Sequence, residues 1–318
     1  MSTKTDKIDR LAELTAAKRT DDGHGESLWR EAFKRLRRSP MAIVGSIVVA
    51  VFVIIAVFGP VIAPYDPVVQ GWGDEVFPNR NVFVGPRGEN LLGLDHLGRD
   101  QFSRMVIGAR QSLLVGVIAT LLGFVVGAIL GGVAGAAAGL GKRWGRRLDT
   151  VLMRFTDMVL AIPALLLAVS VAALMGQSLA TVMIAVGVAQ VPIFARLLRG
   201  SMLAQAHSDY VLAANATGIK RRRIVLAHIL PNSMGPVLVQ ATLTLATAII
   251  DAAALSYLGL GSDQSTPEWG TMLADAQRFL SGAPQLAIYP AVAIIITALG
   301  FTLLGEAMRE SLDPKLRK

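Results

Sequence analysis

The sequence predicts an all-α membrane protein in which six transmembrane helices cross the bilayer and both termini lie in the cytoplasm. Of its 318 residues, 53% are hydrophobic and 17% are charged, whereas soluble domains are about one quarter charged. No charged residue occurs in the 31 positions from Gln111 to Gly141, or in the 38 positions from Met158 to Ala195. A helix needs about 20 mostly apolar residues to cross a bilayer, so both runs are expected to span the membrane.

The composition also excludes several classes of protein. A mean hydropathy of +0.53 excludes disorder as the main state, because disordered chains are poor in apolar residues. The absence of cysteine excludes a disulfide scaffold, thiol catalysis and a cysteine-ligated metal. The net charge of +8 could indicate nucleic-acid binding, but the basic residues lie between the apolar runs. We therefore expect no nucleic-acid partner.

Six apolar segments are expected to form the transmembrane helices. Pro60 and Pro64 mark the end of the first, and Met175–Ser178 is the turn that divides the 38-residue run. Glycines at four-residue spacing in the second segment, from Gly127 to Gly139, allow close approach of another helix. The expected segments are 41–63, a stretch within 112–140, 155–174, 179–198, 232–257 and 285–304.

The polar segments complete the organisation. Residues 1–40 form a tail that is not a cleavable signal, because its apolar run starts only at Met41. We expect residues 1–26 to be solvated and Ser27–Arg38 to form an amphipathic surface helix. The remaining units are a first transmembrane helix at 41–63, an extracytoplasmic loop at 64–105, a five-helix core at 106–307 with a cytoplasmic loop at 199–231, and a tail at 308–318.

Charge sets the expected orientation. The termini and the two loops on their side carry 24 of the 31 Lys and Arg residues. The opposite loops, 64–110 and 257–285, carry six. Positive residues favour the cytoplasmic side, so we expect a multi-pass protein of the cytoplasmic or inner membrane, with its basic surface facing anionic lipid.

The cytoplasmic loop has the pattern of a helix, a turn and a second helix. Ser208 or Asp209 can cap the first helix, and Gly218 suits the left-handed residue that ends it. Pro231 suits the first turn of the next helix, where its missing N–H has little effect. The small side chains of Ala213 and Ala214 leave a smooth surface for another backbone. A short exposed helix of this kind suits docking of a partner.

This loop resembles the signature loop of ABC-importer permeases, which reads Glu-Ala-Ala, three residues, Gly, nine residues, Ile, one residue, Leu-Pro. The matching positions are Ala213, Ala214, Gly218, Leu230 and Pro231. Two positions depart from the pattern. Leu212 stands where the family usually has Glu, and His228 stands at the Ile position.

Further motifs resemble the C-type permease subunit of the dipeptide, oligopeptide and nickel branch. An N-terminal tail, one span and an outer loop before a five-span core also match that subunit. Together the similar regions cover about residues 30–318. The motifs are Leu92–Asp100, Leu255–Gly261, Pro267–Gly270 and the ending Leu312–Arg317.

The resemblance implies a type I permease fold and a set of partners. These are a second homologous permease subunit, two cytoplasmic ATPase subunits and an external substrate-binding protein. In the family, the helix corresponding to about Asp209–Ile219 seats in a groove of the ATPase. No glycine-rich loop ending in Gly-Lys-Ser or Gly-Lys-Thr occurs in the sequence. We therefore expect that this chain is not an enzyme and binds no cofactor, and that ATP and Mg²⁺ are used by the ATPase partners.

Two acidic residues inside the expected spans are candidates for the translocation pathway. Asp157 lies three residues after Arg154 on one helical face, so it could face the pathway or form a structural pair with Arg154. Asp251 lies near the outer end of the fifth span, where it could line the pathway, sit at the outer interface or lie between subunits. No metal site is expected, because Asp95, His96 and Asp100 in one loop do not define a coordination sphere. No catalytic constellation is expected either.

The sequence thus favours a permease subunit that forms half of the pathway of an ATP-driven importer for dipeptides or oligopeptides. Nickel or glutathione-like solutes are alternative substrates for the same class. An ion-coupled secondary transporter is a rival, and its coupling site would have to use Arg154, Asp157 or Asp251. A membrane scaffold without transport is a second rival, which leaves the cytoplasmic loop unexplained.

Overall fold

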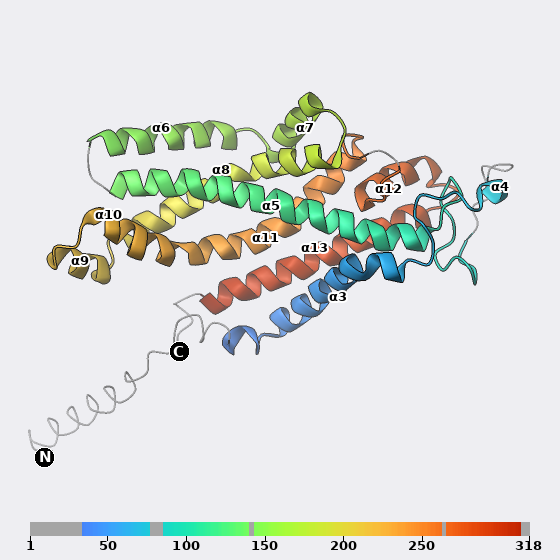
Figure 1. Cartoon of the computed structure of the whole chain (residues 1–318), viewed down its shortest axis with the longest axis horizontal. Coiled ribbons are helices and arrows are strands. Elements are labelled where there is room, and N and C mark those ends of the chain that lie inside the picture. Colours follow the sequence, from blue (N-terminus) through green and yellow to red (C-terminus); the bar gives the residue numbers. More distant parts are fainter. Residues whose placement is uncertain (1–33, 77–84, 140–142, 263–264, 313–318) are drawn as a thin grey trace, which may run out of the picture.

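A computed structural model of the chain describes residues 34–76, 85–139, 143–262 and 265–312. The described residues form helices and connecting turns, together with one isolated β-bridge between Leu94 and Asp100. Figure 1 shows an elongated bundle with α9 at one end and α12 at the other. The tail 1–33, including most of the expected amphipathic helix at Ser27–Arg38, lies outside the described residues.

Among the described residues, five helices are long and apolar enough to cross a membrane. The short helix α10 (Arg221–Ile224) and a π-helical turn, η1 (Val225–Ile229), lead directly into the fourth of them. A helix at Pro40–Ile62 coincides with the first expected span almost residue for residue, whereas α5 and α13 extend well past their expected bounds. The five are α3 (Pro40–Ile62), α5 (Gln101–Gly139), α8 (Leu179–Gln205), α11 (Leu230–Tyr257) and α13 (Gln285–Leu312).

The third expected span, 155–174, is not one helix. It is divided into α6 (Arg143–Leu160) and α7 (Ala164–Met175), which are bent by 89° and could together make a sixth span. Pro163 stands at the N-cap of α7. Proline has no N–H and disfavours helical geometry in the residue before it, which explains the break.

The expected turn at Met175–Ser178 is confirmed. Helix α7 ends at Met175, and Gly176 adopts a φ of +83°. The hydroxyl of Ser178 then accepts a hydrogen bond from the Thr181 N–H at 3.0 Å and caps α8.

The glycines of α5 allow it to pack closely along α8, as expected from their spacing. A Cβ at Gly127 would lie 2.5 Å from the Val191 carbonyl oxygen, and one at Gly131 would meet the Ala195 carbonyl. The two backbones therefore touch where side chains would hold them apart. Successive glycines along α5 contact successively later residues of α8, so the two helices run parallel. The pair α6–α7, which connects them in sequence, therefore runs in the opposite direction.

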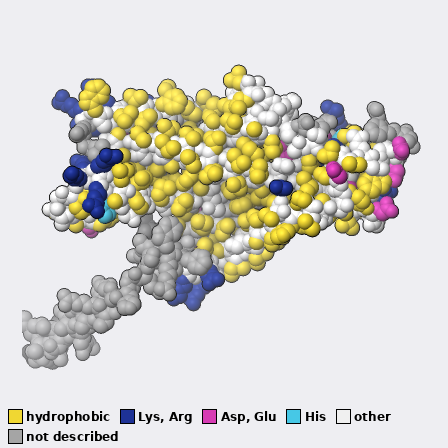
Figure 2. Space-filling view, viewed as in Figure 1, with side chains coloured by type: hydrophobic (Ala, Val, Ile, Leu, Met, Phe, Trp, Pro, Cys, Tyr) yellow, Lys and Arg dark blue, Asp and Glu magenta, His cyan; other side chains and the backbone are white. Residues whose placement is uncertain are grey.

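The two ends of the bundle differ in charge. Helices α9 (Asp209–Ala216) and α10 lie at one end, where Figure 2 shows clustered Lys and Arg side chains. Helices α4 (Gly73–Val76) and α12 (Trp269–Ala276) and the 3₁₀ turn η2 (Gln277–Phe279) lie at the other, where Asp and Glu side chains gather. Between the ends the visible face is mostly hydrophobic, as expected for a surface in contact with lipid.

Candidate functional site

Helix α9 lies exposed at the basic end of the bundle and is held there by one side. Val211 is buried, and Ala214 packs partly against the same cluster of apolar residues. Ala213 is exposed, and so is Leu212, whose side chain is 59% accessible. The two predicted alanines therefore have different roles, since Ala214 holds the helix on the bundle and Ala213 remains available for contact.

Gly218 ends α9 in the left-handed conformation that the sequence predicts. Its φ is +74°, a region in which other residues are strained. The Gly218 N–H donates to the Asn215 carbonyl at 3.1 Å, and the Ile219 N–H reaches back to Ala214 at 3.2 Å. These bonds satisfy carbonyls that the end of a helix leaves free. A Cβ at Gly218 would meet nothing within 4 Å, so backbone conformation alone requires glycine here.

The start of α9 differs in detail from the expected cap. Ser208 occupies the N-cap position, but its side chain makes no capping hydrogen bond. Its hydroxyl donates instead to the Gln205 carbonyl at 2.6 Å. Asp209 lies in the first turn, where its charge is favourable near the positive end of the helix dipole.

Leu230 and Pro231 form the first turn of α11, directly after the π-helical turn η1. Leu230 packs partly against the apolar cluster below α9, and Pro231 is exposed. A proline inside a helix clashes with the carbonyl four residues earlier, and the wider π turn relieves that clash. The Asn232 side chain donates to the His228 carbonyl at 2.8 Å, and the Ser233 hydroxyl donates to Ile229 at 2.7 Å.

One buried apolar cluster joins this loop to the membrane helices. Because its side chains are closely packed, a displacement of α9 must move the ends of α8 and α11 with it. The cluster therefore connects α9 to the ends of α8 and α11. The buried members are Phe194, Leu198, Met202, Val211, Ile224, Val225, Ile229 and Val237.

Asp157 pairs with Arg196 of α8, not with Arg154 as the sequence suggested. Both partners are substantially exposed, at 59% for Arg196 and 47% for Asp157. Closer to α9, Asp149 makes a two-bonded pair with Arg199 at 2.6 and 2.8 Å. Arg154 is exposed and makes no ion pair with any described residue. Sequence spacing identified the acidic residue but not its partner, which lies 39 positions away.

Asp251 lies on a polar stripe of α11 together with Gln240, Thr244 and Thr247. The spacing of four, three and four residues places all four on one face of the helix. Gln240 donates to the Thr244 hydroxyl at 3.1 Å, whereas Asp251 is partly buried and forms no ion pair within the described part of the chain. The structure therefore does not bring Asp251 and Asp157 into one ion-pair network.

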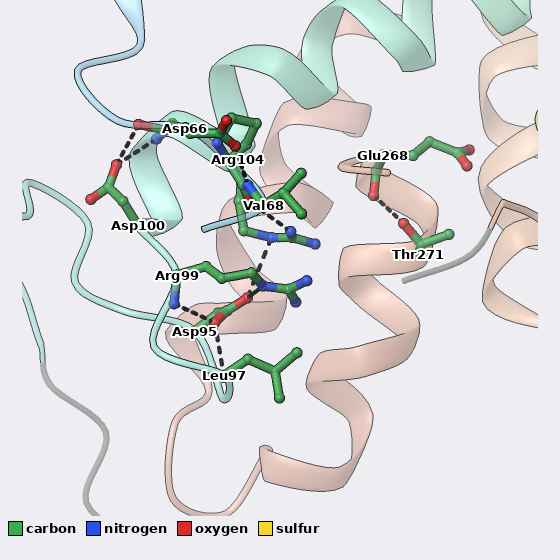
Figure 3. A network of polar contacts seen from close by, with 11 residues as sticks. Asp66, Val68, Asp95, Leu97, Arg99, Asp100, Arg104, Glu268 and Thr271 are labelled. Carbon is green, nitrogen blue, oxygen red and sulfur yellow. Dashed lines mark hydrogen bonds and ion pairs between the residues drawn. The ribbon is translucent and has the colours of Figure 1, made fainter. Parts of the chain in front are cut away.

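The acidic end contains a buried ionic network that the sequence reading did not identify as a unit (Figure 3). Asp95 accepts hydrogen bonds from the Leu97 and Arg99 N–H groups at 2.9 Å and from Arg99 Nε at 2.6 Å. Arg104 Nε lies 3.4 Å from the same carboxylate, and Arg104 also donates to the Pro67 carbonyl at 3.0 Å. The motif Leu92–Asp100 thus ties the loop to the first turn of α5.

Glu268 is a second buried acid at this end. It immediately precedes α12, is 1% exposed, and accepts a hydrogen bond from the Ser256 hydroxyl at 2.9 Å. Burial raises the pKa of Glu268 to about 7, against the opposing effect of the Ser256 hydrogen bond. The adjacent Trp269 donates from its backbone N–H to Ser112 and from its indole N–H to the Met105 carbonyl, which fastens α12 to α5.

We expect Glu268 to make the stability of this end depend on pH. Because its pKa is raised above the ordinary value of 4.5, its contribution is complete below about pH 4.5 and is lost as pH rises through about 7. The difference corresponds to roughly 3 kcal/mol. Thermal unfolding of the purified protein should therefore occur at a lower temperature at pH 8 than at pH 5, and Glu268→Gln should abolish that part of the dependence.

The comparison between the wild type and Glu268→Gln is the informative measurement, because other groups here also titrate. Burial lowers the pKa of His96, which stacks on Phe279 at 5.1 Å, and burial raises the pKa of Asp275. Their contributions are common to both proteins. Identical pH profiles would contradict the role assigned to Glu268.

Two family profiles match the chain. The profile of the binding-protein-dependent transport system inner membrane component covers residues 127–318, which include α6 to α13. The profile of the N-terminal TM domain of oligopeptide transport permease C covers residues 27–82, which include α3.

Relatives match over nearly the whole length. The dipeptide transport system permease protein DppC of Alkalihalophilus pseudofirmus is 41% identical over 92% of this chain and 91% of its own. The glutathione transport system permease protein GsiD of Shigella flexneri is 43% identical over 91% of both chains. A chain of the MetNI methionine ABC transporter in an inward-facing form has the same fold, with a TM-score of 0.53 and 18% identity over 66% of this chain and 96% of that one. This chain therefore belongs to the family of binding-protein-dependent transport system inner membrane components and is a permease of the ABC-importer class.

Proposed function

We propose that this permease forms half of the translocation pathway of an ATP-driven importer for short peptides. The observation that carries the proposal is the exposed helix α9, mounted on the ends of α8 and α11, in a chain about 40% identical to a dipeptide permease. The second half of the pathway comes from a homologous permease subunit. Two ATPase subunits bind at the α9 end and supply ATP hydrolysis, and an external binding protein delivers the substrate.

The substrate class rests on the relatives. Permeases named for dipeptides and for glutathione are similar to this chain to nearly the same degree, 41% and 43%. Both solutes are short peptides with free carboxylates, and this shared chemistry is what we assign to the pathway. A nickel chelate is the alternative cargo within the same class.

Six spans place both termini and the α9 end in the cytoplasm. This arrangement counts the bent pair α6–α7 as one span and is supported by the basic residues at the α9 end and the acidic residues at the α12 end (Figure 2). Because the chain contains no cysteine, a Lys220→Cys variant tests it directly. We expect a membrane-impermeant thiol reagent to label the introduced thiol in inverted vesicles but not in intact cells, and labelling in intact cells would reverse the assigned orientation.

Coupling to the ATPase proceeds through the loop that contains Ala213, Ala214, Gly218, Leu230 and Pro231. Ala213 and Leu212 form contact surface, Ala214 fastens α9 to the bundle, and Gly218 sets the direction of the helix. Leu212 presents an exposed apolar side chain, so we expect its contact with the ATPase to be apolar. Leu230 and Pro231 connect the loop to α11.

Asp157 and Asp251 line the pathway. An exposed ion pair within a spanning segment is unfavourable against lipid, which favours a pathway position for Asp157 and Arg196. The polar stripe that ends in Asp251 supports the same placement for α11, because lipid-facing helices are usually apolar.

The proposal is tested by purifying the tagged chain in mild detergent from its native membranes and identifying the proteins that remain bound. We expect a second permease, ATPase subunits and a binding protein, and ATP-dependent peptide uptake when the complex is placed in vesicles. The ligand found on the binding protein names the cargo. A stable homo-oligomer without ATPase that takes up solute along an ion gradient would instead establish a secondary transporter.

A further inference from the structure

Helix α6 carries a row of exposed polar side chains that continues from the α9 end to the break before α7. Arg146, Thr150, Arg154 and Asp157 are all exposed, and their spacing of four, four and three residues places them on one face. We call these four residues the α6 polar track. Trp144, Phe155 and Met158 are also exposed, but they lie on the neighbouring apolar face of the same helix.

The helix rise gives the depth expected for the end of the polar track nearest α7. Asp157 follows Arg147 by ten residues, which is about 15 Å along a helix. If the basic residues 143–147 mark the headgroup level, Asp157 lies near the middle of a hydrocarbon core of about 30 Å. Arg154 is about 5 Å closer to the α9 end.

The break in the span lies at the same depth. Ala161 and Pro163 are exposed, and the chain bends by 89° between α6 and α7. Pro163 offers no side-chain cap to α7, so the break leaves backbone groups without helical partners. Irregular backbone at membrane depth is tolerated only where protein covers it or where it lines a water-filled cavity. Two independent features, the polar track and the break, therefore indicate contact with water.

The charge of this region is positive. Arg196 is balanced by Asp157, whereas Arg154 has no acidic partner among the described residues and is exposed. An arginine presents two parallel N–H donors that match a carboxylate. The charge and geometry favour an anionic group with a planar pair of oxygens.

We propose that Arg154 binds the free carboxylate of a peptide in transit, next to the Asp157–Arg196 pair that holds the surrounding charges in place. The inference rests on the proposed function, because it requires a peptide in the pathway. It adds a substrate subsite in this chain, between the binding protein and the cytoplasm, that distinguishes a peptide from its amide.

The experiment uses the absence of native cysteine. The whole importer, carrying Thr150→Cys in this chain so that Arg154 one helical turn away is kept, is reconstituted in vesicles with its binding protein and ATP. Labelling of the introduced thiol by a charged methanethiosulfonate reagent is measured alone, with dialanine, and with dialanine amide, each peptide at saturating concentration. We expect the thiol at position 150 to react, and the free peptide to slow the reaction at least several-fold more than the amide does. Adding Arg154→Gln to this variant should remove the difference between the peptide and its amide.

Phe155→Cys is the matched control, since Phe155 is adjacent to Arg154 in sequence but lies on the apolar face. We expect it to react slowly and without protection by peptide. An unreactive thiol in Thr150→Cys, or equal protection of that thiol by the free peptide and the amide, would overturn the carboxylate site.

Transport gives the second readout. Arg154→Gln should lower the maximal rate of uptake about ten-fold or more, as expected for loss of a charge-assisted contact, with KM unchanged because the binding protein sets it. Arg154→Lys, or Arg154→Cys modified with an aminoethyl group, should restore part of the rate, whereas a sulfonatoethyl group should not. Equal rates after either modification would contradict the proposal. If the wild-type complex imports neither dialanine nor glutathione, the proposed function itself fails, whatever the labelling shows.

Discussion

Replacing Gly218 with valine is expected to abolish most transport while leaving the protein folded in the membrane. A non-glycine residue in the left-handed region is unfavourable by about 1–2 kcal/mol, and a β-branched residue by more. Since 1.4 kcal/mol is a ten-fold change in population, only a few per cent of the loops would keep α9 in its docking orientation. Uptake should therefore fall by about ten-fold or more, while the amount of protein in the membrane stays the same.

The open space around Gly218 makes this prediction specific. No atom lies within 4 Å of a Cβ built there, so the effect comes from the φ of +74° and not from a clash. Gly218→Asn should retain more uptake, because asparagine tolerates this conformation. Gly235→Val is the matched control, because Gly235 also has open space but lies in α11 without a positive φ. Normal uptake by Gly218→Val at normal expression would remove the coupling role from this residue.

Local chemistry explains which elements the sequence predicts well. Gly218, Gly176 and the glycine row of α5 each depend on a backbone requirement that a single residue type meets. The first span and the turn before α8 depend on proline, glycine and apolar runs that are visible over a few positions. The resemblance of the loop to ABC-importer permeases rested on the same positions, and it is confirmed by the family profile.

The features that could not be predicted depend on residues far apart in the chain. Asp157 has Arg154 nearby in sequence, yet the fold brings Arg196 to it from α8. Pro163 lies inside a continuous apolar run, so hydropathy hides the break that it causes. Glu268 belongs to a motif that resembles a family pattern, but its burial against Ser256 follows from the packing of α12 on α11 and α5.

The network around Asp95 is the strongest case of such a long-range contribution, and Asp95→Ala is expected to give the largest loss of stability. Arg99 and Arg104 are only 3% and 1% exposed and share this carboxylate. Removing one partner of a buried ion pair leaves charge uncompensated, which destabilises proteins by about 3–5 kcal/mol. Asp275 remains near the two arginines, so we expect a value towards the lower limit.

Thermal unfolding in detergent measures this loss, and we expect the midpoint of Asp95→Ala to fall by about 10 °C. Asp74→Ala is the matched control, because Asp74 is exposed at the same end of the bundle, and a surface change of this kind usually alters stability by less than about 0.5 kcal/mol. Equal midpoints for the two variants would show that the buried arginines find other compensation.

The expected difference has a functional meaning, because Asp95 fixes the loop to the first turn of α5, and α5 is the helix against which α8 and α12 pack. Loss of that attachment at the acidic end would loosen the helices that connect this end of the bundle to the α9 end.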